Sequence, residues 1–299
     1  MKPNKKPVVV GIGELLWDLL PDGRRLGGAP ANFAYHAAAQ GMNAYAVSAV
    51  GDDQAGRDIF SELRSKALAT DYVACLPEPK TGTVTVALAN GIPTYTIHAP
   101  VAWDFIPFSE SLAQLAAQTD AVCFGTLAQR HEISAATIRR FLSLTRPDCL
   151  KVFDVNLRQQ FFNAQRIEAS LGQCDLLKIS DEELPVVARL LKISGDDRGI
   201  LLNLLRRYHL RQVVLTKGKD GSLFSDGQTF LEIPALAFGP TIDTVGCGDA
   251  FTATLTAGLL SGQAPETAMR QASRVAGLVC ANAGAMPEIP EDFRFPSSP

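Results

Sequence analysis

The sequence lacks the features that mark nucleic-acid-binding, membrane and exported proteins. Its 28 Lys and Arg are outnumbered by 31 Asp and Glu, and the net charge of −3 offers no electrostatic footprint for a nucleic acid. No uninterrupted apolar run is long enough to cross a bilayer. The lysines before residues 8–10 do not introduce a signal peptide, because Glu14 and Asp18 interrupt the apolar stretch and no small-residue cleavage site follows. We therefore expect a soluble, cytoplasmic protein.

Cysteines are few and form no recognisable pattern. The six cysteines are scattered through the chain, and no two have the C-x-x-C spacing of a metal site or redox motif. Several lie in apolar, strand-like stretches, as Cys123 does between Val122 and Phe124. The pattern favours buried free thiols in a reducing compartment. The six are Cys75, Cys123, Cys149, Cys174, Cys247 and Cys280.

Two common nucleotide-binding motifs are also missing. No G-x-x-x-x-G-K-[ST] segment is present, which excludes a Walker-type phosphate loop. Gly11 and Gly13 follow an apolar stretch as in a dinucleotide fingerprint, but Leu16 stands where the third glycine belongs. A phosphate group would therefore have to be held by another device.

Short apolar runs alternate with helix-like segments along the chain. Strands are predicted at 8–13, 44–50, 120–124, 150–154, 176–179 and 212–216. Helices are predicted at 29–40, 55–66, 109–118, 134–144, 182–191, 199–208 and 250–260. This alternation predicts an α/β fold with a mostly parallel central sheet flanked by helices, in one domain spanning 1–299. Ligands of such sheets bind beyond the carboxyl ends of the strands.

One segment departs from this alternation. Residues 81–89 and 94–98 alternate with a period of two around Asn90-Gly91, which predicts a β-hairpin. Pro93 places the second strand at an edge, or makes it begin just after the proline. The hairpin would form a lid or an interaction surface, or else merely extend the edge of the main sheet. Asp104 follows it and is a candidate to close over a ligand.

The run Asp243-Thr244-Val245-Gly246-Cys247-Gly248-Asp249-Ala250-Phe251 is the most informative segment. Two glycines frame a small residue directly before a predicted helix, so bare backbone N–H groups and the helix dipole would favour an anion there. Asp249 stands at the mouth of this anion site and could accept a proton from a hydroxyl that attacks a phosphoryl group. An N-capping aspartate in a strand-to-helix turn is the structural alternative.

This run closely resembles the C-terminal signature D-T-x-G-A-G-D-A-F of the ribokinase/PfkB family of sugar kinases. The resemblance implies a ribokinase-like fold with a small β lid, here roughly 14–26 and 72–104. It implies that Asp249 is the catalytic base and that Gly246, Cys247 and Gly248 supply the anion hole through their backbone N–H groups. Cys247 stands where the family usually has alanine, which a backbone donor should tolerate.

Other segments resemble the family's sugar-binding motifs. Gly27-Gly28-Ala29-Pro30-Ala31-Asn32 is similar to G-G-x-x-x-N, which implies that Gly27, Gly28 and Asn32 contact the sugar. Asp18 occupies the aspartate of a fructokinase-like G-E-x-L-x-D, which implies contact with sugar hydroxyls. Arg158 ends a segment similar to F-D-x-N-x-R and would pair with substrate or phosphate oxygens, or else with a surface carboxylate.

The nucleotide side is implied in the same way. Residues 178–183 resemble K-x-N-x-x-E, in which Glu183 would order the magnesium, but Ser180 replaces the asparagine. Ser180 and Glu183 also suit a capping box. Residues 216–221 resemble a T-x-G-x-x-G nucleotide loop, and many family members bind a monovalent cation near Asp243. The implied nucleotide contacts are Lys178, Thr216, Lys217, Gly218, Gly221 and Asn282.

The resemblance thus implies an enzyme that uses ATP and Mg²⁺, with K⁺ as a further cation, to phosphorylate a primary sugar hydroxyl. Fructose is the first choice of acceptor, with 2-keto-3-deoxygluconate and ribose as alternatives. A sugar-sensing regulator that has lost phosphoryl transfer is an alternative from another class, motivated by Ser180 and Cys247. A dinucleotide-dependent oxidoreductase is disfavoured by Leu16. Dimerisation through the lid is common among relatives, so a homodimer is expected.

Overall fold

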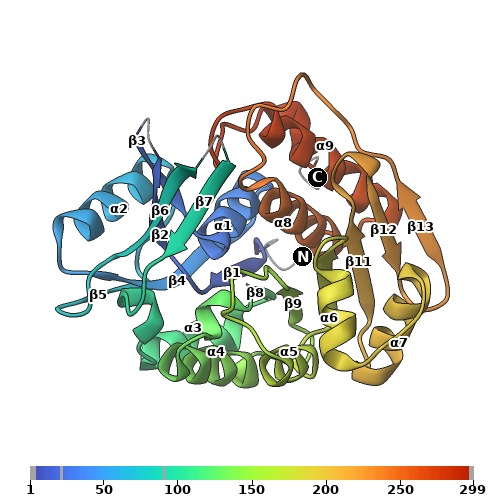
Figure 1. The fold of residues 1–299 in the computed structure, drawn as a ribbon, viewed down its shortest axis with the longest axis horizontal. Helices are drawn as coiled ribbons and strands as arrows, with labels where there is room; N and C mark the ends of the chain where they lie inside the picture. The colour runs from blue at the N-terminus through green and yellow to red at the C-terminus, as the bar shows by residue number, and fades with distance from the viewer. Residues whose placement is uncertain (1–4, 21–22, 90–91, 296–299) are drawn as a thin grey trace.

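The computed structural model describes residues 5–20, 23–89 and 92–295, and its larger sheet has nine strands in that part of the chain (Figure 1). They are β1 (Val8–Ile12), β4 (Asn43–Gly51), β5 (Val73–Leu76), β8 (Ala121–Phe124), β9 (Leu150–Asp154), β10 (Leu176–Ser180), β11 (Gln212–Thr216), β12 (Ser222–Ser225) and β13 (Phe230–Ile233). The spatial order is β13-β12-β11-β10-β9-β8-β1-β4-β5. Neighbours from β11 to β5 are parallel, whereas β12 and β13 pair antiparallel. The predicted α/β class with a mostly parallel sheet is confirmed.

The strand sequences explain why this sheet is covered on both faces. All five residues of β1 and all four of β8 are buried. A continuous apolar run suits a parallel strand, because both of its faces meet helices. The register pairs Val10 of β1 with Val122 of β8 and with Tyr45 of β4, so β1 lies inside the sheet.

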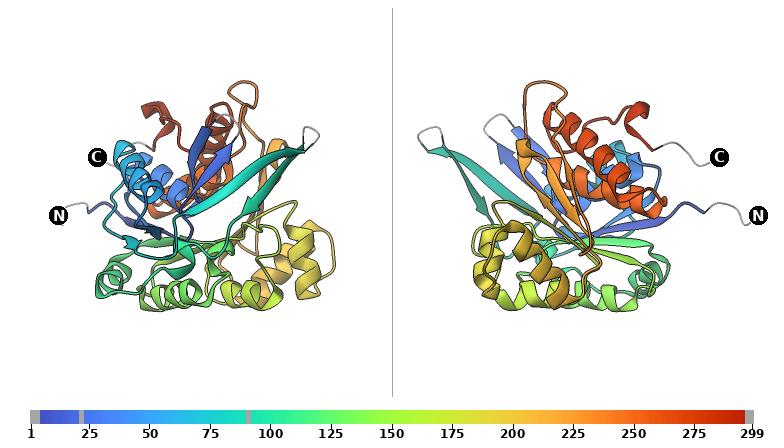
Figure 2. Two further views of the ribbon diagram at one scale, coloured as in Figure 1. Left: turned by 60° about the vertical axis from the view of Figure 1, so that its left-hand side comes forward. Right: turned by 90° about the vertical axis from the view of Figure 1, so that its right-hand side faces the viewer.

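Helices form a layer on each side of this sheet (Figures 1 and 2). One layer contains α3 (Glu110–Gln118), α4 (Glu132–Leu144), α5 (Ala164–Leu171), α6 (Leu184–Leu191) and α7 (Asp197–Tyr208). The other contains α1 (Ala29–Ala39), α2 (Gln54–Ser65), α8 (Cys247–Leu260) and α9 (Pro265–Cys280). Short 3-10 turns are η1 (Ala102–Phe105), η2 (Leu127–Gln129), η3 (Gly218–Asp220) and η4 (Glu291–Phe293). The two main hydrophobic clusters correspond to these two layers.

A second, four-stranded sheet projects from the body (Figure 2). Its strands are β2 (Leu16–Leu20), β3 (Gly23–Gly27), β6 (Gly82–Ala89) and β7 (Ile92–Ile97), in the order β3-β2-β6-β7. The hairpin prediction is confirmed by the antiparallel pairing of β6 with β7, and Pro93 lies in the edge strand β7. Residues Asn90 and Gly91 of the predicted turn lie outside the described residues. Since β6 pairs with β2, the hairpin does not extend the main sheet.

The predicted lid boundary of 72–104 is too wide. β5 pairs in parallel with β4 and therefore belongs to the large sheet. At the other end, η1 enters the core, where Trp103 is fully buried. Within 72–104, only the strands between 82 and 97 belong to the small sheet, where they join β2 and β3. No helix within the described ranges has the length and apolarity to traverse a bilayer.

Candidate active site

The carboxyl ends of the central strands and the N-terminus of α8 meet around one small cavity. It is lined by Glu14, Ala29, Pro30, Phe33, Cys123, Phe124, Gly125, Asp154, Asn156 and Asp249. Glu14 follows β1, Gly125 follows β8, and Asn156 follows β9. This is the edge at which parallel sheets bind ligands, as the sequence predicts.

The turn that begins α8 has the backbone geometry of an anion site. Gly246 is the N-cap with φ of 80°, and a Cβ there would lie 2.5 Å from the Cβ of Ala285, so only glycine fits. Gly248 and Asp249 are the second and third residues of the helix, and their N–H groups come too early to have an intrahelical acceptor. The Cys247 N–H, predicted as a donor together with those of Gly246 and Gly248, instead donates to the Thr244 carbonyl oxygen at 3.3 Å. The Cys247 N–H therefore has an acceptor within the turn itself.

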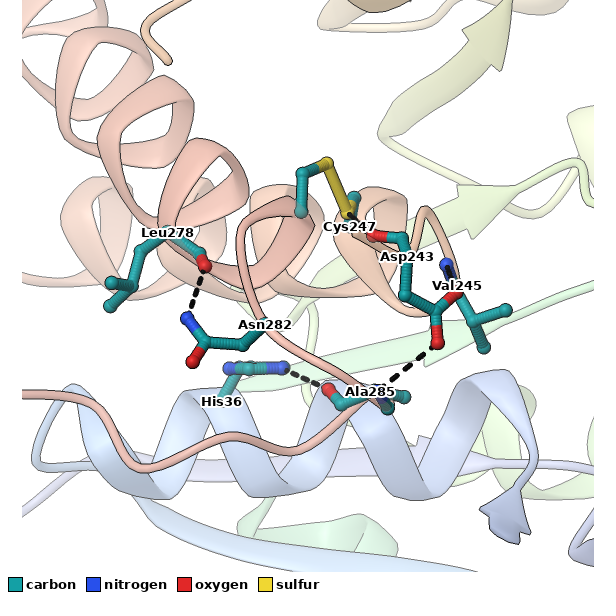
Figure 3. Close-up of a disulfide and its surroundings, with 9 residues drawn as sticks. His36, Asp243, Val245, Cys247, Leu278, Asn282 and Ala285 are labelled. Atoms are coloured by element: carbon teal, nitrogen blue, oxygen red, sulfur yellow. Dashed lines mark hydrogen bonds between the residues drawn. A yellow bond between two sulfur atoms is a disulfide. The ribbon is translucent and has the colours of Figure 1, made fainter. Parts of the chain in front are cut away.

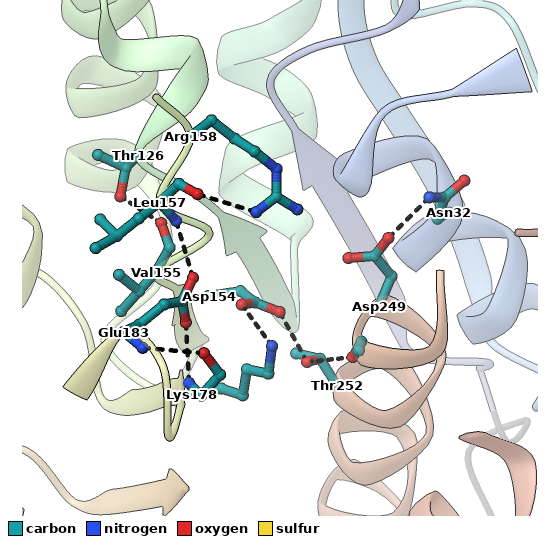
Figure 4. Close-up of polar contacts among 12 residues, drawn as sticks. Asn32, Thr126, Asp154, Val155, Leu157, Arg158, Lys178, Glu183, Asp249 and Thr252 are labelled. Atoms are coloured by element: carbon teal, nitrogen blue, oxygen red, sulfur yellow. Dashed lines mark hydrogen bonds and ion pairs between the residues drawn. The ribbon is translucent and has the colours of Figure 1, made fainter. Parts of the chain in front are cut away.

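Asp249 is held by a residue from the other half of the chain. Asn32 Nδ2 on α1 donates to Asp249 Oδ2 at 2.8 Å (Figure 4). Burial, and then the charge of Asp154, raise the pKa of Asp249 to about 7. The Asn32 hydrogen bond and the charges of Lys178 and Arg158 oppose this rise. A carboxyl group with this pKa can take up and release a proton near neutral pH, as the predicted base must.

Asn32 also presents an unused acceptor beside this base. Its side chain is 3% exposed, and its buried Oδ1 has no hydrogen-bond partner among the described residues. Gly28, the N-cap of α1, has φ of 120°, and a Cβ there would lie too close to the Glu14 carbonyl oxygen. A Cβ at Gly27 would overlap the Asp18 carboxylate. Because neither glycine has a Cβ, the segment before Asn32 can pass close to the Glu14 backbone and to the Asp18 carboxylate.

Asp18 lies on β2 of the small sheet, and its environment is partly apolar. Burial raises its pKa to about 6, with the charge of Asp243 adding to the rise and that of Arg158 opposing it. Arg158 is exposed, donates to the Leu157 carbonyl oxygen at 3.0 Å, and points toward Asp249 in Figure 4. Its charge acts on both Asp18 and Asp249, so the structure brings these three predicted site residues into one electrostatic environment.

A buried ion pair lies beside the turn that begins α8. Lys178 Nζ on β10 lies 3.0 Å from Asp154 Oδ1, and Thr252 Oγ1 donates to Asp154 Oδ2 at 2.9 Å (Figure 4). Burial alone would lower the pKa of Lys178, but the charges of Asp154 and Glu183 outweigh it and raise the pKa. An ideal Cβ on Gly248 would be 3.1 Å from Nζ. A fixed ammonium group therefore adjoins the N-terminus of α8.

Ser180 and Glu183 exchange reciprocal bonds like those of a capping box, but in the turn before α6, whose N-cap is Glu183 itself. The Ser180 N–H donates to Glu183 Oε2 at 2.9 Å, and the Glu183 N–H donates to Ser180 Oγ at 3.2 Å. Glu183 Oε1 also accepts from the Leu157 N–H at 2.8 Å. Within the described ranges no group of three His, Cys, Asp or Glu side chains is placed to hold a metal ion. Each Glu183 oxygen keeps a free lone pair, so this carboxylate fits a role on a metal-bound water rather than in a protein cage.

The predicted nucleotide loop is formed by η3 and its flanks. Thr216 ends β11, Gly218 has φ of 50°, and Gly221 has φ of 92°. A Cβ at Gly221 would overlap a carbonyl oxygen of β13, so this glycine is required by close packing of the backbone. Lys217 Nζ lies 3.2 Å from Asp197 Oδ2 and is one-third exposed. In this structure Lys217 is therefore paired with a carboxylate of α7.

Asp243 links the anion turn to the segment after α9. Its Oδ1 accepts from the Val245 N–H at 3.0 Å, and its Oδ2 accepts from the Gly284 N–H at 3.1 Å and from Arg25 at 3.2 Å. Asn282 Nδ2 donates to the Leu278 carbonyl oxygen at 2.8 Å, which caps the end of α9 (Figure 3). These contacts are structural, and the predicted roles of Asp243 and Asn282 toward a cation and a nucleotide stay predictions.

The prediction that all six cysteines are free is wrong for two of them. Cys247 and Cys280 form a disulfide, with Cα atoms 5.8 Å apart (Figure 3). α8 begins beside the end of α9, which brings together residues 33 positions apart in the sequence. Cys123, Cys149 and Cys174 are buried free thiols as predicted, and a free Cys75 is exposed. The expectation of a reducing compartment therefore loses part of its basis.

Asp104 does not lie open to a ligand as the sequence analysis predicts. It is 1% exposed, and its two oxygens each accept from Arg130 at 2.8 Å. The Arg130 guanidinium stacks on Trp103, 3.9 Å from the ring centroid. The aspartate is buried because η1 packs into the core, where its charge is compensated by an arginine.

Three residues of the site were not predicted from the sequence. Asp154 pairs with Lys178, Thr252 donates to Asp154, and Glu14 lines the cavity. Asp154 and Glu14 stand at or directly after the ends of predicted strands, which is a signal that could have found them. Thr252 gives no such signal, because a threonine one turn inside a helix is common.

A base beside an anion site is the arrangement needed for phosphoryl transfer to a hydroxyl, so fold and site together point to the small-molecule kinases. Comparison with known protein families identifies which kinases these are. The model of the pfkB family carbohydrate kinases matches residues 22–292, and the chain belongs to this family of sugar kinases.

Individual relatives agree with the family. The chain is 31% identical over 305 residues to a fructokinase of Klebsiella pneumoniae, covering 93% of this chain and 95% of the relative. A fructokinase structure with bound ATP from Xylella fastidiosa superposes with a TM-score of 0.83 at 20% identity, covering 93% and 94% of the two chains. A Vibrio cholerae fructokinase mutant with fructose, ADP and potassium ion bound has a TM-score of 0.77 at 23% identity, covering 94% of each. The similarity to these structures confirms the ribokinase-like fold.

Proposed function

We propose that the protein transfers the γ-phosphoryl group of ATP to the primary hydroxyl of a sugar, with fructose as the first choice and fructose 6-phosphate as the product. The observation that carries this proposal is the Asn32–Asp249 hydrogen bond at the N-terminus of α8. It holds a base with a pKa near 7 beside an anion site, which sugar binding alone would not require. The fructokinase relatives support the choice of acceptor.

Each residue of the site has its own role in the proposed reaction. Asn32 orients Asp249 with its amide group and offers Oδ1 to a sugar hydroxyl. Asp249 accepts the proton of the primary hydroxyl while that oxygen attacks the γ-phosphorus. The N–H groups of Gly248 and Asp249 and the Lys178 ammonium stabilise the charge on the phosphoryl oxygens. Because these donors are fixed before the substrates bind, they cost little reorganisation during the reaction.

Mg²⁺, K⁺ and a second copy of the chain belong to the proposal as well. Bound Mg²⁺ would neutralise charge on the phosphates of ATP, with Glu183 ordering one of its waters. The Vibrio relative supports a potassium ion, which we place near Asp243. β7 is an edge strand of the small sheet and offers a surface for dimerisation.

A coupled assay of ADP release with Mg²⁺-ATP tests the proposal directly. The panel of acceptors contains fructose, ribose, 2-keto-3-deoxygluconate, glucose and adenosine. We expect turnover with fructose to exceed that with the others. Sugar binding without turnover of any acceptor would contradict a kinase and favour the sugar-sensing regulator.

Removing the base should separate catalysis from binding. In Asp249→Asn the side chain can no longer accept the proton, so kcat should fall by roughly 10²–10⁴-fold. The amide still contacts Asn32, so fructose affinity measured by calorimetry without ATP should change little. Asp292→Asn is the matched control, since Asp292 is exposed in η4 and its substitution removes the same charge. Retained turnover in Asp249→Asn would exclude Asp249 as the base.

A further inference from the structure

The disulfide between Cys247 and Cys280 begins in the turn that the proposed mechanism uses. Cys247 is the first residue of α8 and stands between the N-cap Gly246 and the donor Gly248. Cys280 is the last residue of α9. Their Cα atoms are 5.8 Å apart, which is within the usual range for a disulfide. The bond therefore constrains the backbone that would hold the transferred phosphoryl group.

The disulfide leaves the anion site itself open. The donors of this site are backbone N–H groups, whereas the Cys247 side chain reaches from the start of α8 to α9 (Figure 3). Cys247 packs against a small apolar cluster that α8 and α9 share. Oxidation or reduction of the sulfur atoms thus changes no donor of the anion site. An effect on catalysis has to act through the position of the turn.

Hydrogen bonds fasten the first part of this turn to α9, and the disulfide fastens its last part. The N–H groups of Ile242 and Asp243 donate to the Cys280 carbonyl oxygen at 2.9 and 3.3 Å. Cys247, at the other end of the turn, is joined to the same residue by the sulfur bond. After reduction, the start of α8 would keep only noncovalent contacts with the end of α9.

The two cysteines are also accessible to a reductant. Cys247 and Cys280 are partly exposed, whereas Cys123, Cys149 and Cys174 are buried. Exchange between thiols and disulfides proceeds through a thiolate, and the N-terminal end of a helix favours the negative charge of a thiolate. Cys247 lies at such an end. This pair is therefore better placed for exchange than the buried thiols.

We propose that Cys247 and Cys280 form a redox-active pair that controls phosphoryl transfer, with the disulfide as the more active form. Its effect on turnover rests on the proposed function. A low-molecular-weight dithiol attacks one sulfur of the pair and forms a mixed disulfide, and its second thiol then displaces the other cysteine. Two protons and two electrons pass to the protein, which ends with two thiols, while the reductant ends as a cyclic disulfide. Oxidation is the reverse exchange.

The direction of the effect follows from how the donors act. The N–H groups of Gly248 and Asp249 stabilise the phosphoryl charge because they are fixed before the substrates bind. Reduction frees the residue directly before them, so these donors have to be ordered during the reaction and kcat falls. Asn32 and Asp18 lie outside the turn, on α1 and β2, so the affinity for the sugar is kept.

The linkage and the turnover are measured on the same samples. The protein is equilibrated with reduced or oxidised dithiothreitol, which is removed before assay. Mass spectrometry after alkylation gives the linked fraction, and the coupled assay with fructose gives kcat. We expect kcat of the oxidised form to be about tenfold higher, which is less than the roughly 10²-fold loss that a 1 Å misplacement causes. Fructose affinity should be equal in the two forms, and reoxidation should restore kcat.

Two variants show which thiols are responsible. Cys280→Ser cannot form the bond and leaves the residues of the turn unchanged, so it should have the kcat of the reduced wild type after either treatment. Cys75→Ser removes an exposed free thiol and should respond to dithiothreitol like the wild type. A Cys280→Ser variant with the kcat of the oxidised wild type would overturn the proposal.

Amide exchange tests the turn without any sugar. The Cys247 N–H donates to the Thr244 carbonyl oxygen, and the Ala250 N–H donates to that of Gly246 at 2.8 Å. Because removing a cross-link lowers the cost of local opening, peptides that contain these amides should exchange on the order of tenfold faster in the reduced protein.

The outcomes separate redox control from a disulfide that only stabilises the fold. Equal kcat and equal exchange in the two forms, with only the melting temperature changed, would overturn the proposal. So would a faster reduced form, or a linkage that dithiothreitol does not break. Failure of the proposed function has a different signature, because no acceptor would then cause ADP release in either form. Redox-dependent exchange at the start of α8 would in that case still support the control of the turn.

Discussion

At the scale of single residues, Asp249 has to be deprotonated before it can accept a proton. Burial, and then the charge of Asp154, raise its pKa to about 7, so the active fraction of the free enzyme grows as the pH rises through that value. We expect kcat/KM for the sugar to rise about tenfold per pH unit below pH 7 and to level off above it. Initial rates at constant ionic strength, from about pH 5 to about pH 9, measure this profile.

Asp154→Asn tests the electrostatic part of this rise in pKa, which adds to the larger effect of burial. Removing this carboxylate takes away the charge that raises the pKa of Asp249 and leaves the Lys178 ammonium nearby. The midpoint of the profile should therefore move to lower pH, while the Asp292→Asn profile should match the wild type. A midpoint that does not move would show that Asp154 has no electrostatic effect on the base.

The sequence predicts the types of residue in the site better than their contacts. Asn32 and Asp249 are predicted separately as a sugar ligand and a base, and the hydrogen bond between them spans 217 positions. Local patterns cannot show such a contact, because it depends on how α1 and α8 pack. The same limit explains the error at Asp104, whose partner Arg130 is 26 positions away. Glu14 was overlooked because a carboxylate after a strand looks exposed unless the covering helix is known.

At the scale of elements, the disulfide joins the start of α8 to the end of α9. A bond that closes a loop across 33 positions should stabilise the fold by roughly 2–4 kcal/mol through the entropy of the unfolded chain. Protein purified without reductant should yield a linked peptide pair containing Cys247 and Cys280 on mass spectrometry after alkylation. Cys280→Ala should melt several degrees lower than the wild type, whereas Cys75→Ala should not. Alkylation of both Cys247 and Cys280 without prior reduction would show that the thiols are free.

Elements with a strong local pattern were predicted well, and those without one were missed. β9 and β11 were predicted with their observed bounds, and α1 ends within one residue of its prediction. Local pattern did not predict β2 and β3, because each is short and carries charged residues whose partners, such as Asp58 for Arg24 and Asp243 for Arg25, are far away in the sequence, but the family resemblance placed their region, roughly 14–26, in the lid. α9 does carry a usable signal, since Pro265 begins it and its buried residues recur at helical spacing.

At the scale of the whole molecule, the alternation of elements predicts the class of fold and the edge where ligands bind, but not the order of strands. β1 pairs with β4 and β8, which are distant in the sequence, and this pairing creates the cavity around Asp249. The order follows from which helix faces can be buried together, and those packing energies are not visible in any one segment. The family resemblance supplied what local patterns could not.

The stability of the whole fold should depend on pH through His36. This residue of α1 is fully buried, and its Nε2 lies 2.8 Å from the carbonyl oxygen of Ala285, which follows α9. Burial lowers its pKa from 6.5 to about 4. As the pH falls below 6.5 the unfolded chain binds a proton that the folded protein does not accept until about pH 4. Stability is therefore lost in this window, by up to about 3 kcal/mol from this residue.

Asp249 and Asp18 change the stability in the opposite direction. Because their pKa values are raised, the folded protein binds their protons at a higher pH than the unfolded chain does, so stability is gained as the pH falls. The contribution of His36 must therefore be isolated by difference. In His36→Gln the amide can still donate to Ala285 but does not titrate, so the wild type should lose up to about 3 kcal/mol relative to this variant between pH 6.5 and pH 4. Urea unfolding at a series of pH values measures this difference. His209→Asn is the control, since His209 is exposed and asparagine tolerates its φ of 55°. A difference that stays constant with pH would mean that His36 is protonated as readily in the folded protein as in the unfolded chain.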